Sequence, residues 1–522
     1  MRISYQDPYF VVKCTFDERA IPKAAGFKFI EKRWRTRNVY HAMKLSSCFD
    51  DSATAELTRL IARVEESNST TPEIFYEAPQ DLDYMAHQHV GIRFIIENKQ
   101  CLLCDDMGVG KTIQVIGAMN EIKPKRTLIV CPASLQHNWA RELAKWSTQQ
   151  KLVTVVGPAR RAKVTPFTDI TITTYGRSAN TWMDMYRDTK WDLLVFDEAQ
   201  KIKNSDTLAS KCFMPLDVPR RVYVTGTPIL NRPIELHNIV NRIDYEFWGD
   251  RVSYGMRYCG AYYQQQWHYP GATNKAELQF HLRSRHMLRR TKAQVLPSLP
   301  PKRREVIELT DTYRNVDRDS QSFYAELRED PFQDEWATFE RLSHLRHMSA
   351  QAKMPLALKH IHLVLESVDK VVIFAYHRDI LDGLSDALQK YNPAQIDGST
   401  TKRHAQVDKF ESGENGCRVF IGQITAAGTG LTLASACHVI FVELDWVPGN
   451  LTQAEDRCHR IGQINPVTVQ HLVRRDSIDS RMLKSIVKKQ NNIDNCLDDG
   501  AEFDWYSELI GAAQEQPVWM VK

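Results

Sequence analysis

Apolar, β-branched segments alternate with amphipathic segments between residues 80 and 230. The apolar segments are strand candidates, and they read CLLCDD, RTLIVCP, LVTVVG, DITITTY, WDLLVFDEA and RRVYVTGT. Amphipathic stretches such as TIQVIGAMNEI and LQHNWARELAKW stand between several of them. Near-continuous apolar strands separated by helices are typical of a parallel sheet with helices on both faces. This part of the chain is therefore predicted to form an α/β lobe.

A second series of the same kind runs from about residue 365 to about residue 475. Its strand candidates are KVVIFAYH, AQIDGST, CRVFIGQI, HVIFVELD and VTVQHLV, and the helical segments RDILDGLSDALQKY and KRHAQVDKFES fall between them. The pattern predicts a second α/β lobe.

The segments outside these two series lose the strand pattern. Residues 235–360 become helical, aromatic and basic, and the proline-rich stretch LPSLPPKRR is expected to interrupt them as a linker. The polar stretch EESNSTTPE ends the first segment. The predicted division is a small N-terminal α+β module (1–75), lobe 1 with a nucleotide site (80–234), its helical protrusion (235–290), a linker between lobes (291–312), a helical protrusion of lobe 2 (313–360), lobe 2 (361–488) and a C-terminal tail (489–522).

Composition places the chain among soluble intracellular proteins. Of 522 residues, 43% are hydrophobic and 25% are charged, and the net charge is only +4. No apolar run approaches the roughly 18 residues of a membrane span, and the N-terminus lacks the apolar core of a secretory signal. The eleven cysteines do not resemble a disulfide framework. We expect a protein that is neither secreted nor membrane-bound, either in the cytoplasm or nucleoid (prokaryotic or viral-encoded) or in the nucleus.

The segment CLLCDDMGVGKT holds the first candidate chemistry. Cys101 and Cys104 have zinc-site spacing, but no second pair follows at a suitable distance, so we expect them to pack in a buried strand. The segment ends in Gly-x-Gly-Lys-Thr, as a phosphate-binding loop does, although Asp105 replaces the first glycine of that pattern. In a phosphate loop, Lys111 would reach the β- and γ-phosphates and the Thr112 hydroxyl would ligate Mg²⁺. An ordinary strand-to-helix turn remains the alternative.

Two further groups of residues suit nucleotide hydrolysis. In LLVFDEAQ, Asp197 and Glu198 end an apolar strand, where Asp197 would hold Mg²⁺ through water and Glu198 would deprotonate the attacking water. In QAEDRCHRIGQ, Arg457 and Arg460 are three residues apart, so on a helix they would share one face. From lobe 2 they could reach the γ-phosphate as arginine fingers. A solvated acidic loop and a solvated arginine face are the alternatives.

These motifs, with others in order along the chain, resemble the Swi/Snf-type ATPases of helicase superfamily two. The resemblance covers HQHVGIRF, DDMGVGKT, LIVCPASLQHNW, ITTYG, DEAQKIKN, VTGTPILN, MLRRTKAQVLPSLPPK, ITAAGTGLTL and WVPGNLTQAEDRCHRIGQ. It implies two RecA-like lobes with parallel sheets, helical insertions between them, and ATP with Mg²⁺ as cofactors. It also implies a DNA-dependent ATPase, because the family consists of translocases on double-stranded DNA.

The resemblance assigns roles residue by residue. The nucleotide site would comprise Gln88, Asp106, Met107, Gly108, Val109, Gly110, Lys111 and Thr112, with Gln88 on the adenine. Coupling between site and movement would involve Gln200, Thr225, Gly428 and Gln453. Contacts to DNA in the motor would come from Pro132, Ser134, Thr174 and Thr425. Two departures from the family pattern are Asp106 in place of glutamate and Gln200 in place of histidine. We expect Gln200 still to bridge the nucleotide site to Thr225 by hydrogen bonds.

Within the family, ITAAGTGLTLASACHVIFVELDWVPG most resembles the annealing-helicase (HARP-like) clade. Some members of that clade carry a small basic and aromatic module before the motor, and residues 10–45 are weakly similar to it. There, Lys32, Arg33, Trp34 and Arg35, with Arg37 nearby, suit phosphate contacts and base stacking. A small β-rich domain with a solvated basic edge is the alternative. The basic stretch HLRSRHMLRRTK (281–292) is open between DNA contact and a hinge face.

The resemblance implies a monomeric motor that closes its lobes on ATP while duplex DNA, forked or branched DNA included, lies across both lobes. Binding through the DNA backbone would be independent of sequence. Fork remodelling, strand annealing or displacement of bound proteins suits such a compact motor better than nucleosome remodelling. The alternatives are a strand-separating helicase and a non-translocating ATP-dependent DNA-binding switch. The sequence does not identify protein partners.

Overall fold

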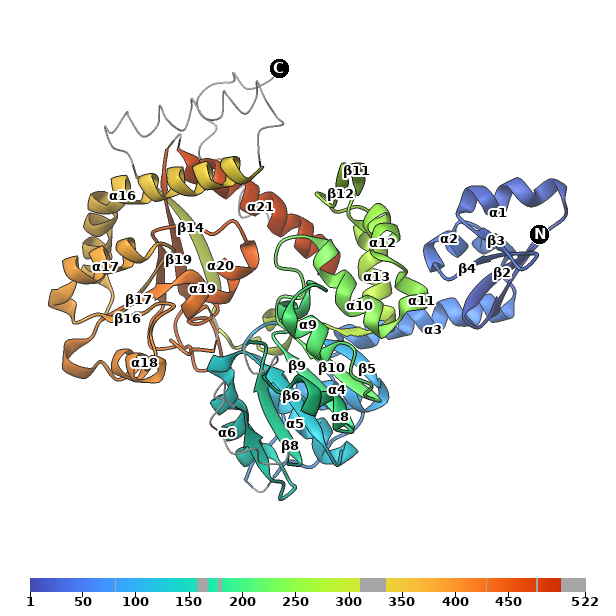
Figure 1. The fold of residues 1–522 in the computed structure, drawn as a ribbon, viewed down its shortest axis with the longest axis horizontal. Coiled ribbons are helices and arrows are strands. Elements are labelled where there is room, and N and C mark those ends of the chain that lie inside the picture. Colours follow the sequence, from blue (N-terminus) through green and yellow to red (C-terminus); the bar gives the residue numbers. More distant parts are fainter. Residues whose placement is uncertain are drawn as a thin grey trace, which may run out of the picture.

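Two α/β lobes lie side by side, and a small N-terminal module stands at the far end of lobe 1 (Figure 1). The computed structural model describes residues 1–79, 81–156, 168–176, 181–309, 335–428, 430–475 and 477–498, and of residues 335–340 only the backbone. Among these residues no helix has the length and apolar character needed to cross a membrane.

Lobe 1 is built on a seven-stranded parallel sheet in the order β13-β5-β10-β9-β6-β8-β7. Its strands are β5 (Gln100–Leu103), β6 (Thr127–Cys131), β7 (Val153–Val155), β8 (Ile170–Thr174), β9 (Leu193–Asp197), β10 (Arg220–Val224) and β13 (Met287–Leu288). Its helices are α4 (Ala86–Glu97), α5 (Lys111–Ile122), α6 (Gln136–Trp146), α8 (Met183–Asp188) and α9 (Leu208–Phe213). All six predicted strands are confirmed. Since the strands are apolar on both sides, a hydrophobic cluster forms on each face of the sheet.

The protrusion of lobe 1 contains α10 (His237–Ile243), α11 (Tyr245–Trp248), α12 (Arg251–Tyr258) and α13 (Lys275–Arg285). It also contains a two-stranded hairpin, β11 (Tyr262–Gln264) and β12 (Gln266–His268), which the sequence interpretation missed. After α13 the chain returns to lobe 1 as β13 at the edge of the sheet, next to β5.

Lobe 2 has a six-stranded parallel sheet in the order β14-β19-β18-β15-β17-β16. Its strands are β14 (Lys302–Leu309), β15 (Val371–Ala375), β16 (Ala394–Ile396), β17 (Val419–Gln423), β18 (His438–Phe441) and β19 (Val467–Arg474). Its helices are α16 (Glu335–Ser367), α17 (Arg378–Ala387), α18 (Arg403–Ser412), α19 (Ile424–Ala427), α20 (Pro448–Glu455) and α21 (Ile478–Leu497). The five predicted strands are confirmed.

The predicted linker is more structured than its prolines suggest. Within residues 291–312 the chain forms α14 (Lys292–Val295) and then β14, which pairs with β19 along its whole length. The basic residues that begin β14 concealed the strand, because they bind acids of lobe 2 instead of facing solvent. The end of the predicted linker and most of the predicted lobe 2 protrusion (310–334) lie outside the described residues.

The N-terminal module is an antiparallel sheet with its own core. Its strands β1 (Arg2–Gln6), β2 (Tyr9–Lys13), β4 (Arg33–Thr36) and β3 (Lys28–Ile30) are arranged in that order, with α1 (Ala20–Ala25), α2 (Val39–Met43) and α3 (Asp51–Asn68). Asp50 caps α3 by accepting from Ala53 N. The helix then runs from the module to lobe 1 (Figure 1). The predicted small α+β module is confirmed.

The C-terminal helix α21 connects the two lobes. It begins in lobe 2, where Met482 and Ile486 pack in the core, and it ends in lobe 1, where Ile493, Cys496 and Leu497 belong to the core cluster. Figure 1 shows this helix, in red, extending from lobe 2 to the protrusion of lobe 1. The first nine residues of the predicted tail (489–497) are therefore the end of a helix whose apolar side chains pack in lobe 1, and residues 499–522 lie outside the described residues.

Candidate functional site between the lobes

The loop after β5 has the backbone of a phosphate cradle. Gly108 and Gly110 have φ angles of 80° and 83°, in the left-handed region where a side chain is strained, and α5 begins at Lys111 directly after them. A helix that starts at a glycine loop presents free backbone N–H groups, which bind anions. Thr112 lies in the first turn of α5, at the mouth of this loop.

Lys111 is half-buried at the base of the loop. Its Nζ donates to the carbonyl oxygens of Asp105 and Asp106 at 2.8 Å each, and burial lowers its pKa although four nearby carboxylates oppose the shift. A Cβ at Gly226, in the loop after β10, would come within 3.3 Å of Nζ. The glycine thus lets the two loops approach each other around the ammonium group.

The predicted adenine reader is packed against the same loop. Gln88 is 2% exposed on α4, and its Oε1 accepts from Met85 N at 2.9 Å. A Cβ at Gly110 would lie 2.4 Å from Gln88 Nε2, so this amide touches the loop backbone. Its neighbour His87 hydrogen-bonds to Val109 O at 2.9 Å through Nε2. The start of α4 therefore supports the loop from one side.

The two acids after β9 have different environments. Asp197 ends the strand, and its carboxylate accepts from Trp139 Nε1 at 2.7 Å and from Glu198 N at 3.0 Å. Burial, together with the neighbouring Glu198, raises the pKa of Asp197 to about 6. Glu198 has a φ of 53° and accepts from Gln200 Nε2 at 2.5 Å. A buried pair of carboxylates near an ammonium group favours a bound cation, because a cation stabilises both charged forms.

The coupling residues are linked differently from the expectation. Gln200 donates to Glu198, and its Oε1 has no hydrogen-bond partner among the described residues, so the expected bridge to Thr225 is replaced by a bond to the acid. Thr225 Oγ1 instead accepts from Thr227 N. Thr227 Oγ1 accepts from Gln453 Nε2 at 2.8 Å, which gives a direct bond between lobe 1 and lobe 2. Thr227 was missed by sequence reasoning, although it belongs to the quoted VTGTPILN segment.

Arg457 and Arg460 both lie beside the phosphate loop. Arg457 donates to Met107 Sδ at 3.7 Å, and a Cβ at Gly108 would lie 3.1 Å from Arg460 Cβ. Burial lowers the pKa of both guanidinium groups, that of Arg460 to about 10 with a contribution from Arg457. The expectation that they share a helix face is wrong, because α20 ends at Glu455. They converge through the carbonyl oxygen of Leu431, to which both donate.

A set of buried ion pairs, which sequence reasoning missed, joins the linker to both lobes. On the lobe 1 side, Arg290 and Asp105 are both completely buried, and Arg290 donates to both carboxylate oxygens of Asp105. Asp106 accepts from Lys292 N and forms an ion pair with Arg289. The Asp106 carboxylate therefore faces the linker rather than a nucleotide. Only its backbone carbonyl contacts Lys111 in the loop. Although burial opposes ionisation, Arg290 lowers the pKa of Asp105.

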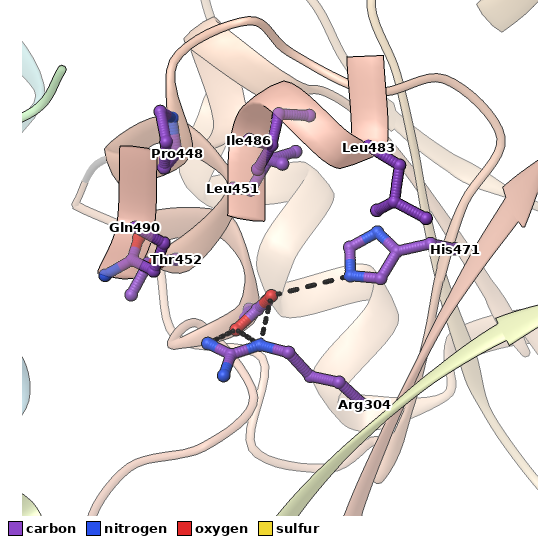
Figure 2. Close-up of a pocket in the computed structure, with 9 residues that line it drawn as sticks. Arg304, Pro448, Leu451, Thr452, His471, Leu483, Ile486 and Gln490 are labelled. Carbon is purple, nitrogen blue, oxygen red and sulfur yellow. Dashed lines mark hydrogen bonds and ion pairs between the residues drawn. The ribbon is translucent and has the colours of Figure 1, made fainter. Parts of the chain in front are cut away.

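On the lobe 2 side, the acids next to Arg457 bind the other half of the linker. Lys292 and Lys302 pair with Asp456, and Lys302 and Arg304 pair with Glu455. Figure 2 shows Arg304 and His471 on two sides of one carboxylate, which is Glu455. Although burial favours the neutral acid, Arg304 and Lys302 lower the pKa of Glu455 to about 2. A cavity of about 270 Å³ lies between these pairs and the phosphate loop.

These ion pairs also show whether the basic stretch 281–292 is available to contact DNA. Arg283, Arg289 and Arg290 are at most 7% exposed and are bonded inside the protein, which contradicts the DNA-contact interpretation. Cys101 and Cys104 are confirmed as buried core residues, and burial raises the pKa of each thiol to about 12.

The residues of lobe 1 that are predicted to touch DNA lie at the ends of two neighbouring strands. β6 and β8 are paired in parallel with Cys131 opposite Thr174, so Pro132 and Thr174 follow neighbouring strand ends. A Cβ at Gly430 of lobe 2 would come within 3.0 Å of Ser134 Oγ, which places the two lobes in contact at this edge. Thr425 is exposed on the short helix α19.

In the N-terminal module the predicted cationic group divides in two. Lys32 and Arg33 are exposed at the β3–β4 turn, and the ring of Trp34 packs on Phe29 with centroids 5.3 Å apart. Arg35 pairs with Glu31 and lies over the ring of Tyr9 rather than Trp34. Arg37 also lies over Tyr9 and binds Glu246 at 2.5 Å, so it docks the module on lobe 1.

Comparison with known proteins gives a consistent result. The SNF2-related domain family matches residues 59–361, and the helicase conserved C-terminal domain family matches residues 353–462. The SWI/SNF-related matrix-associated actin-dependent regulator of chromatin subfamily A-like protein 1 of Xenopus tropicalis is 33% identical over 420 residues, which cover 78% of this chain and 44% of that protein. DNA annealing helicase and endonuclease ZRANB3 is 33% identical over 427 residues in Bos taurus, covering 77% and 39%. The chain thus spans less than half the length of these curated relatives.

Among solved structures, the Sulfolobus solfataricus SWI2/SNF2 ATPase core in complex with dsDNA is 23% identical, with a TM-score of 0.39 over 78% of this chain and 93% of that chain. The Sulfolobus solfataricus SWI2/SNF2 ATPase core domain is 22% identical, with a TM-score of 0.39 over 87% and 99%.

Proposed function

The chain belongs to the SNF2-related family, the DNA-dependent ATPases of helicase superfamily two, and from this premise we propose that it is a motor that hydrolyses ATP to move along duplex DNA. Its ATP site would lie between the lobes. The observation that carries the proposal is the approach of Arg457 and Arg460 from lobe 2 to the phosphate loop of lobe 1. A site divided between two lobes ties hydrolysis to their relative movement.

The residues at this site suit Mg²⁺ and ATP. The glycine loop and the start of α5 would hold the phosphates, Lys111 would neutralise them, and the amide of Gln88 would meet the adenine. Thr112 and Asp197 would hold Mg²⁺. Burial and the neighbouring Glu198 raise the pKa of Asp197, and a bound cation would favour its charged form. When bound, the metal would neutralise charge that develops on the phosphates.

The protein's own residues would then perform the proton transfer. Glu198 would orient the attacking water and take its proton, and the Gln200 amide holds the Glu198 carboxylate in place. Arg457 and Arg460 would stabilise charge in the transition state, which arginine fingers do by about 10³–10⁵ in rate. The hydrogen bond from Gln453 to Thr227 would hold the two lobes together in the closed state.

Duplex DNA would lie along the edge where the lobes meet. Pro132, Ser134 and Thr174 of lobe 1 and Thr425 of lobe 2 would hold the phosphate backbone there, so binding would not depend on sequence. Opening and closing of the lobes would shift one grip relative to the other. The exposed pair Lys32 and Arg33, with Trp34, would add a contact to forked or branched DNA.

Within this function we place the chain with motors that remodel forks, anneal strands or displace bound proteins. The support is its similarity to proteins named DNA annealing helicase and endonuclease, together with a basic, aromatic module ahead of the motor. Action by a monomer is part of the proposal.

The test is ATP hydrolysis by the full chain without DNA and with single-stranded, duplex and forked DNA, with Lys111→Ala as the inactive control. We expect strong stimulation by duplex and forked DNA that is lost in the variant. Displacement of a triplex-forming strand would then establish translocation. DNA affinity should fall steeply, by about 10³-fold or more, between 50 and 200 mM salt if several phosphates are contacted.

The role of the N-terminal module is tested with Lys32→Glu combined with Arg33→Glu, against Lys44→Glu as a control at another exposed lysine of the module. The double variant should lower the preference for forked over plain duplex DNA, and the control should not. A hydrolysis rate that no DNA changes would refute the motor. An unchanged fork preference would refute only the module's part.

A further inference from the structure

The β11–β12 hairpin is an exposed ribbon that no other strand joins among the described residues. It projects from the helical protrusion of lobe 1, beyond α12 and away from the lobe 1 sheet (Figure 1). An isolated hairpin is only marginally stable in water, so something must fix this one in place.

The base of the hairpin is firmly attached to the protrusion. Gly271 N donates to Cys259 O, Ala261 N donates to Gly255 O, and the side chains of Thr273 and Asn274 both donate to Arg257 O. At Gly255 a Cβ would lie 2.2 Å from the ring of Tyr269, so the glycine is needed for the ring to pack on α12. The ribbon is therefore mounted rigidly on α12.

Both faces of the ribbon carry aromatic rings. Tyr262 is paired with His268 and Tyr263 with Trp267, and because successive strand residues point to opposite faces, the two pairs lie on opposite faces. The first pair is stacked with centroids 5.2 Å apart, and the second meets edge to face at 5.6 Å. Tyr262, Tyr263 and Trp267 are 48%, 66% and 37% exposed. Such a concentration of exposed rings marks an interaction surface.

The chemistry of the segment selects the partner. No acidic residue occurs from Arg251 to Ala276, and the strands themselves consist of aromatic residues, histidine and glutamine without an aliphatic side chain. Aromatic rings also occur at protein interfaces, but the absence of carboxylates from this segment favours a polyanion. Flat rings with amide groups suit unpaired bases, because every base offers a π face and the strand is a polyanion.

We propose that the β11–β12 hairpin binds the unpaired bases of a DNA strand that leaves the duplex held by the motor. Tyr263 and Trp267 stack on successive bases, and the glutamines at the turn contact their edges. The proposal rests on the proposed function only in the identity of the nucleic acid, since the stacking surface itself needs no ATP. It assigns to lobe 1 a single-strand site separate from the N-terminal module.

The experiment measures binding in the absence of ATP, by fluorescence anisotropy of a short single-stranded oligodeoxynucleotide, a blunt duplex and a fork, at one salt concentration. The variant is Tyr263→Ala with Trp267→Ala in the full chain. Both side chains are exposed, so the fold should be retained. We expect affinity for the single strand to fall about tenfold or more and affinity for the duplex to stay unchanged, as alanine substitution at base-stacking positions predicts.

Two control variants separate stacking from other causes. Tyr245→Ala removes a ring that is 65% exposed elsewhere on the same protrusion and should have no effect. Tyr263→Phe with Trp267→Phe leaves an aromatic ring at both positions and should restore binding. In addition, 2-aminopurine in the single strand should lose fluorescence on binding to the native chain but not to the alanine variant.

Equal single-strand affinity for native and alanine variant chains overturns the proposal, as does an equal loss on the blunt duplex. Failure of the proposed function is a separate result, because it is read from ATP hydrolysis. If duplex DNA stimulates hydrolysis in the alanine variant as it does in the native chain while single-strand affinity is unaltered, the motor stands and the hairpin site fails. If no DNA stimulates hydrolysis by the native chain but single-strand binding needs the rings, the hairpin site stands and the motor fails.

Discussion

At the scale of single residues, Asp197 is held from two sides by neighbours of the predicted DNA contacts. Trp139 on α6 donates to its carboxylate, and the hydroxyl of Tyr175 donates to its carbonyl oxygen at 2.7 Å. Trp139 follows Ser134 by little more than one helical turn, and Tyr175 directly follows Thr174. Movement of either segment on DNA would therefore move the carboxylate proposed to hold Mg²⁺, which gives a short route from DNA to hydrolysis.

Replacement of Trp139 by phenylalanine tests this route. The ring volume is largely kept, but the hydrogen bond to the carboxylate is lost, and bonds to charged groups contribute about 1.5–3 kcal/mol. We expect DNA-stimulated ATP hydrolysis to fall about tenfold and the Mg²⁺ concentration for half-maximal rate to change, with DNA affinity retained. Trp146→Phe is the control, because Trp146 lies on the same helix, equally buried, with an indole N–H that has no partner among the described residues. Equal effects of the two changes would remove Trp139 from the route.

At the scale of elements, the linker is a buried connector and not a flexible tether. Cations in the linker and directly before it bind the acids that stand next to functional residues. Arg290 and Arg289 bind Asp105 and Asp106 before the phosphate loop, and the linker cations bind Glu455 and Asp456 before Arg457. Loss of one member of a buried ion pair leaves an uncompensated charge and costs about 3–5 kcal/mol. The linker thus fixes the phosphate loop and the arginines relative to each other.

Glu455→Gln tests the connector and its pH dependence. The pKa of Glu455 is lowered to about 2, so its contribution to stability is complete above its unfolded-state pKa near 4.5 and is lost as the pH falls through about 2. We expect a lower Tm for the variant, with a difference from the native chain that is constant from pH 8 to pH 5 and narrows below pH 4.5. Glu308→Gln, at an exposed acid of β14, should show neither effect. A Tm difference that narrows between pH 8 and pH 5 would contradict the assignment.

At the scale of the whole molecule, the end of α3 and the end of α21 meet at two arginines of lobe 1. Arg283 donates to the side chain of Asn68 at the end of α3 and to Leu497 O at the end of α21. Asp498 pairs with both Arg283 and Arg289. One place therefore joins the N-terminal module, lobe 1 and the helix from lobe 2, directly before the linker. A change in lobe closure would move the end of α21.

Asp498→Asn tests this junction. Loss of a charged partner of two buried arginines should cost about 2 kcal/mol and release the end of α21. We expect faster amide hydrogen exchange in residues 489–498 and a lower Tm. Asp494→Asn is the control: burial raises the pKa of Asp494, and among the described residues its side chain accepts from Gln490 alone. Unchanged exchange in the Asp498 variant would show that the apolar contacts of Ile493, Cys496 and Leu497 hold the helix alone.

Much of this protein was determined by the sequence itself, because the information is local. Apolar runs predict the strands of both sheets. Glycines that permit positive φ predict the phosphate loop, and the order of the motifs along the chain identifies the family. The candidate residues Lys111, Asp197, Glu198 and Gln453 needed no tertiary information to be singled out.

The tertiary structure alone decided what each polar residue binds, because partners far apart in sequence leave no local pattern. The basic stretch 281–292 had the composition of a DNA-binding surface, yet Arg289 and Arg290 are buried as internal ion pairs with Asp498 and Asp105. For the same reason β14 resembled a linker, and the apolar end of α21 resembled a tail until the lobe 1 core supplied its contacts. Arg457 and Arg460 meet through a carbonyl oxygen in another loop rather than along a helix.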